Sequence, residues 1–179
     1  MTMRTSRLAG ALMALAAAAV ATSPAAAAAP CLSTDEAEAL VLAVAPDLIR
    51  QTGVQCATEL PPNALLRRPS SSFLSRFQAE ADSAWPRART ALAKLAGPDV
   101  QPLLESGFAR TLLGSLVAPL LQVQTGDCGA VNRLVTLLEP LPPRNAAAVV
   151  VTVVQLSEAD RQKRGLRPSG LPICTGARP

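Results

Sequence analysis

The chain has 179 residues, of which 17 are lysine or arginine, 13 are aspartate or glutamate and none is histidine. Without histidine the chain has no Ser-His-Asp or Cys-His catalytic machinery and no histidine-ligated zinc. It also has no tyrosine, one tryptophan and three phenylalanines, too few stacking platforms for single-stranded nucleic acid, so we expect no nucleic-acid partner.

The amino-terminal residues have the order of segments that is typical of a secretory signal. Arg4 and Arg7 give a basic start, residues 8–20 form an unbroken apolar run, and residues 25–29 are all alanine. The apolar run is shorter than the ~20 residues that a membrane-spanning helix needs. We therefore predict a cleavable signal peptide over residues 1–29 and an exported protein, periplasmic or extracellular.

Two other interpretations of this end of the chain are less favoured. An uncleaved anchor over residues 8–29 would have to continue its helix through Pro24. A lipid anchor on Cys31 would place the rigid Pro30 directly before the modified cysteine. We expect no membrane span in the remainder of the chain.

The remaining part, residues 30–179, is about the size of one domain with its own core. Both arginines of the signal leave with it, so this part has a net charge of only +2. We predict a single helical domain that ends in an extended tail over about residues 165–179.

The first helix is predicted over residues 34–52. Ser33 and Glu36 have the spacing of a capping box, and Gly53 is expected to end the helix. Pro46 should kink it. Apolar residues recur on one face at Ala37, Leu40, Val41, Val44 and Leu48. Residues 54–69, which contain three prolines, are predicted to form a loop.

The second helix is predicted to begin within residues 70–72 and to end at Gly97, with a kink or break at Pro86. Its apolar face comprises Phe73, Phe77, Ala81, Ala84, Ala88, Leu92 and Leu95. Asp99 is expected to cap a third segment. Because residues 111–123 are apolar on nearly every face, we predict that they form a central, fully buried helix, bent at Pro119.

A fourth helix is predicted to start at Gly126 and Asp127 and to stop before the prolines of residues 140–143. A fifth is predicted over residues 146–156, although its β-branched centre could also form a strand. Helix follows helix without an alternating segment, so the predicted class is all-α. The expected architecture is an irregular bundle of about five helices, several kinked by proline, around the buried third one.

The four cysteines are Cys31, Cys56, Cys128 and Cys174, an even number that predicts disulfides in an exported chain. Cys31 and Cys56 flank the first helix, whose ends lie roughly 28 Å apart, so these two cannot pair. Of the two remaining arrangements we prefer Cys31–Cys174 with Cys56–Cys128, because domain termini often lie close together.

No cluster of residues in the sequence predicts a catalytic, cofactor-binding or metal-binding site. Glu80 and Asp82 beside Trp85 could suggest acid–base work on a sugar, but side chains two apart on a helix point in different directions. Asp35, Glu36 and Glu38 could suggest calcium, but first-turn acids favour a helix without any metal. We expect no catalytic residue, no cofactor and no metal site.

These observations favour an exported, non-enzymatic helical protein with a structural or protein-interaction role, for which another envelope protein is the expected partner. The alternative is a carrier of a small apolar ligand or lipid, held in a pocket between kinked helices. Gly107, Gly114 and Ser115 could allow such a pocket or simply a close helix approach. A carboxylate enzyme is the third hypothesis.

Overall fold

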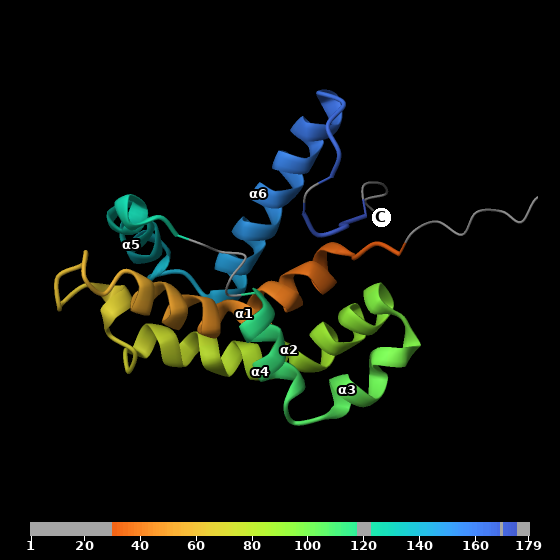
Figure 1. Cartoon of the computed structure of the whole chain (residues 1–179), viewed down its shortest axis with the longest axis horizontal. Helices are drawn as coiled ribbons and strands as arrows, with labels where there is room; N and C mark the ends of the chain where they lie inside the picture. Colours follow the sequence, from red (N-terminus) through yellow and green to blue (C-terminus); the bar gives the residue numbers. More distant parts are fainter. Residues whose placement is uncertain (1–29, 118–122, 169, 175–179) are drawn as a thin grey trace, which may run out of the picture.

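The computed structural model describes residues 30–117, 123–168 and 170–174. Within these ranges the protein is built from six α-helices joined by loops and 3-10 turns, with no strand beyond one isolated bridge between Leu32 and Ile173 (Figure 1). The all-α prediction is confirmed.

Helix α1, Thr34–Gln55, begins at a complete capping box. The backbone N–H of Glu36 donates to Ser33 Oγ over 3.2 Å, and that of Ser33 donates to Glu36 Oε2 over 2.7 Å. The prediction that Gly53 ends the helix is wrong. The helix continues to Gln55, and Gly53 lies inside it. The missing side chain lets the backbone of Leu66 cross there, since a Cβ on Gly53 would sit 2.1 Å from the Leu66 carbonyl oxygen.

Helix α2, Ser72–Ala96, is capped by Ser71 and packs along α1 (Figure 1). It continues through Pro86 as one helix, so the predicted break is absent. Gly97 ends it with a φ of 89°, a conformation that favours glycine. The residues of α2 that are buried are Phe73, Leu74, Phe77, Ala81, Ala88 and Ala91.

The two short helices α3, Gln101–Glu105, and α4, Ala109–Val117, correct the predicted architecture. Asp99 lies in a 3-10 turn and does not cap α3. The apolar third segment is not a buried centre, because α4 exposes Leu112 and Leu116 and buries only Ala109 and Gly114. Residues 118–122, including the predicted bend at Pro119, lie outside the described residues.

Helix α5, Cys128–Leu138, follows a 3-10 turn at Thr125–Asp127, close to the predicted start. Helix α6, Pro143–Lys163, is longer than predicted at both ends. It starts at Pro143, which is suited to a first helical position, and its β-branched centre is helical.

The central element is α1, which contacts α2, α4 and α6. One core cluster joins Leu32 to Ala37, Leu40, Ala43, Ala88, Ala91 and Val151, with Ile173 packed against it. Figure 1 shows α6 rising away from the α1–α2 layer, and the following segment returning to the start of α1. We call this returning segment, residues 164–174, the strap.

Candidate interaction surfaces

Helix α6 has one buried face and one exposed apolar face. Ala147 and Val151 pack inward, and the exposed face carries a row of large aliphatic side chains. We call this row the α6 stripe: Val149, Val150, Val153 and Leu156, which are 40% to 66% exposed. The spacing of four and three residues from Val149 to Leu156 places them on one side of the helix. Among the described residues nothing covers this side.

The α6 stripe ends in charged groups. Lys163 lies seven residues after Leu156 and so on the same side of the helix, and Arg167 follows in the strap. Asp160 is engaged by Arg164, its partner at i+4. Lys163 and Arg167 form no salt bridge within the described part of the chain, which leaves this end of the stripe basic.

An apolar groove of about 450 Å³ lies where the end of α1 meets the turn at Leu65–Arg67 and the start of α2. We call it the Gly53 groove. Its apolar lining includes Ile49, Gly53, Val54, Leu65, Leu66 and Leu74. Three arginines, Arg50, Arg67 and Arg68, also line it, and no acidic residue does.

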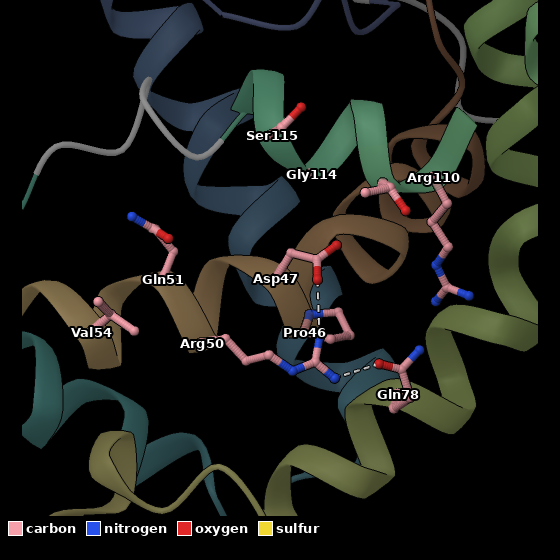
Figure 2. Close-up of a pocket in the computed structure, with 10 residues that line it drawn as sticks. Pro46, Asp47, Arg50, Gln51, Val54, Gln78, Arg110, Gly114 and Ser115 are labelled. Atoms are coloured by element: carbon pink, nitrogen blue, oxygen red, sulfur yellow. Dashed lines mark hydrogen bonds and ion pairs between the residues drawn. The ribbon is translucent and has the colours of Figure 1, made fainter. Parts of the chain in front are cut away.

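A second groove, of about 430 Å³, lies between α1, α2 and α4, and we call it the Asp47 groove (Figure 2). Arg50 links α1 to α2 here, since Nη2 donates to Gln78 of α2 over 2.7 Å while Nη1 donates to Asp47 of α1 over 2.9 Å. Gly114 allows α4 to approach here, because a Cβ at this position would lie 2.6 Å from Asp47 Oδ2. Asp47, Arg50 and Gln78 therefore bond to one another within this groove.

The acidic residues Glu80 and Asp82, which were singled out in the sequence, bind different partners. Glu80 accepts a hydrogen bond from Arg144 over 2.7 Å, and Asp82 accepts one from Arg110. The hydrogen bond from Arg110 holds the pKa of Asp82 below its ordinary value. Each carboxylate is thus occupied by a different arginine.

The acids at the start of α1 do not form a cluster with other metal-ligating side chains either. Glu36 completes the capping box and contacts Lys94 Nζ at 2.8 Å. Over the described ranges no group of three or more Cys, Asp or Glu side chains could hold a metal ion.

Two disulfides join parts of the chain that are distant in sequence. Cys56 and Cys128 are bonded with their Cα atoms 5.5 Å apart, inside a core cluster that also contains Leu60 and Leu66. Cys31 and Cys174 are bonded with their Cα atoms 5.0 Å apart, at the two ends of the described chain.

The α6 stripe was missed by sequence reasoning. Its 4–3 spacing is visible in residues 146–156, but the same spacing is typical of a core face, and the sequence does not say which side of an apolar helix is covered. The helices α4 and α5 also expose leucines, at Leu112, Leu116, Leu134 and Leu137.

Comparisons of the chain with protein-family models, with curated proteins and with solved structures find no match. No helix among the described residues is both long enough and apolar enough to cross a membrane.

Proposed function

We propose that this is an exported, non-enzymatic protein that acts by protein–protein contact through the α6 stripe. The observation that carries the proposal is the exposure of four aliphatic side chains on one side of a helix whose other side is buried at Ala147 and Val151. Contiguous exposed apolar surface of this kind marks interaction sites.

The partner that fits this surface is an amphipathic helix with acidic residues beside its apolar face. Valines and a leucine at spacings of four and three form a ridge that packs against another helix. The basic end of the stripe at Lys163 and Arg167 complements acidic groups on the partner. A membrane surface fits less well, because the stripe contains no Trp or Phe.

The export part of the proposal covers residues 1–29 as a cleavable signal peptide. Two disulfides and the lack of a spanning helix in the described ranges are compatible with this location. Intact-mass measurement of the exported protein should give a chain that begins within a few residues of Pro30. A mature chain that keeps Met1 would contradict export by a cleaved signal.

The contact can be tested with a photo-crosslinking residue placed at Val153 in the native exported protein. We expect an adduct whose crosslinked partner segment is an amphipathic helix with flanking acids. Leu156→Asp should abolish the adduct, and high salt should weaken it. The matched control is Leu137→Asp on α5, since Leu137 is 65% exposed and Leu156 is 66% exposed.

Four outcomes would contradict the proposal. These are the absence of an adduct, equal loss of the adduct in both variants, an adduct with a second copy of the chain, and Leu156-dependent binding to vesicles of phosphatidylethanolamine and phosphatidylglycerol. The third would point to self-association, and the fourth to a membrane surface.

The Gly53 groove supports a second candidate, a carrier for an amphiphile with an apolar tail and an anionic head. The groove is in the usual size range of ligand pockets, and Arg67 and Arg68, which form no salt bridge among the described residues, complement a carboxylate. Native mass spectrometry should then show binding of a long-chain fatty acid but not of the matching alcohol, and equal binding of both, or of neither, would contradict this candidate.

A further inference from the structure

The two disulfides differ sharply in their surroundings. Cys56 and Cys128 are 0% and 1% exposed and lie among the apolar side chains of a core cluster. Cys174 is exposed and Cys31 is half-buried. A thiolate must reach a sulfur atom to exchange with it, so only the second bond is open to a reagent in the folded protein.

The strap has few attachments besides this disulfide. Two backbone hydrogen bonds tie it to Leu32, which precedes α1: Leu32 N–H donates to Pro172 O over 2.7 Å, and Cys174 N–H donates to Leu32 O over 2.8 Å. Ile173 packs against the core, and Arg161 donates to the carbonyl of Arg167.

The described strap residues between Arg164 and Pro172 are all exposed. A segment whose residues are mostly exposed and that packs one apolar side chain against the core belongs to the part of a protein that opens most easily.

We propose that the Cys31–Cys174 disulfide is a thiol–disulfide exchange site for a dithiol reductant, and that its reduction releases the strap. The thiolate of the dithiol attacks the sulfur of Cys174, the more exposed of the two residues, and Cys31 leaves as a thiolate that takes up a proton. The second thiol of the reductant then attacks the mixed disulfide and frees Cys174. Two electrons and two protons pass to the protein, and the dithiol becomes a disulfide.

Release of the strap removes contacts from the half of α6 that projects from the core, residues 154–163. Gly170 of the strap lies against Val154 and Glu158, on the side of α6 opposite to Leu156. Gln155 Nε2 also donates to Thr34 Oγ1 over 3.2 Å, beside the same disulfide. Without the strap, residues 154–163 lose the packing of Gly170 against Val154 and Glu158 and keep the hydrogen bond between Gln155 and Thr34 as a link to α1.

The loss of support affects the α6 stripe, because Leu156 at its carboxyl-terminal end lies in the projecting half of the helix. An effect of strap release on docking therefore rests on the proposed function. The exchange reaction itself does not, because accessibility of the disulfide is independent of any partner. Reduction would then switch the orientation of the docking surface while the core disulfide stays intact.

The exchange is tested on the oxidised, folded protein with dithiothreitol as the probe. Thiols are trapped with iodoacetamide at increasing times and identified by peptide mass spectrometry. We expect Cys31 and Cys174 to be alkylated at least about tenfold faster than Cys56 and Cys128. Reduction of both disulfides at one rate, or of Cys56–Cys128 first, would overturn the assignment.

The release of the strap is tested by hydrogen exchange, which needs no docking partner. Amides at Leu32 and over residues 156–163 should exchange faster in the selectively reduced protein and equally fast in the double variant Cys31→Ser, Cys174→Ser. Exchange over residues 146–151 should not change. Unchanged exchange at Leu32 and over residues 156–163 in both samples would show that the disulfide does not hold the strap.

Discussion

Gly53 sets how closely α1 approaches the turn at Leu65–Arg67. A methyl group there would overlap the Leu66 carbonyl, which is backbone and cannot rotate away. We expect Gly53→Ala to lower the free energy of unfolding by about 1–3 kcal/mol, the usual cost of overpacking. Gly129→Ala in α5 is the matched control, because a Cβ there meets nothing within 4 Å. It should be neutral or stabilising by up to about 1 kcal/mol in urea denaturation.

Ionisation of Glu36 makes the free energy of unfolding depend on pH, and the shift of its pKa sets the direction of that dependence. The hydrogen bond from Lys94, and then that from the Ser33 backbone, hold the pKa of Glu36 below its ordinary value. The ionised carboxylate therefore stabilises the fold above the pKa of the unfolded chain, and this contribution is lost as the pH falls through the lower folded pKa. Because Lys94 is 40% exposed, the ion pair contributes less than about 1 kcal/mol.

Glu36→Gln tests this dependence, since glutamine keeps the capping acceptor but not the charge. Its stability deficit should be largest near neutral pH and should vanish in acid, as measured by urea denaturation at a series of pH values. A deficit that is constant with pH would show that the capping geometry, and not the charge, is what the substitution affects.

The same substitution should lower the free energy of unfolding by different amounts on the two faces of α6. Val151 is 1% exposed and packs in the core with Leu32, whereas Val153 is 56% exposed. Val151→Ala should cost about 2 kcal/mol, because it leaves a cavity beside side chains that relax only partially. Val153→Ala should change stability by less than about 0.5 kcal/mol. Similar losses in both variants would mean that the stripe is covered in solution.

Elements that depend on local signals could be predicted from the sequence, and features that depend on neighbours elsewhere in the fold could not. The start of α1 and the extent of α2 follow from local signals, a capping box and serines before an apolar stripe. The burial of residues 111–123 was predicted from apolarity alone and was wrong for α4, because a helix is buried only if neighbours cover it. The continuation of α1 past Gly53 needed the position of Leu66, which is distant in sequence.

At the scale of the whole molecule, the two disulfides close long loops of the unfolded chain. Sequence separations of 143 and 72 residues correspond to about 5 and about 4.4 kcal/mol in the chain-entropy description, which are upper-end values. The exclusion of Cys31–Cys56 could be made from helix length alone. The difference in exposure between the two bonds could not, because it depends on what surrounds each sulfur.

Non-reducing peptide mapping checks this arrangement directly. It should yield one peptide pair joining Cys31 to Cys174 and one joining Cys56 to Cys128. A peptide pair that joins Cys31 to Cys56 would be incompatible with α1 as a continuous helix, since its ends are then far beyond bonding distance.

The 5.0 Å between the Cα atoms of Cys31 and Cys174 has a mechanical consequence. If the protein is pulled by the segments before Cys31 and after Cys174, the tension passes from one cysteine to the other through the sulfur–sulfur bond. The helices carry almost none of it. Once that bond is reduced, the load falls on the two hydrogen bonds of Leu32 and then on the core, so a tether through this protein would be rigid when oxidised and extensible when reduced.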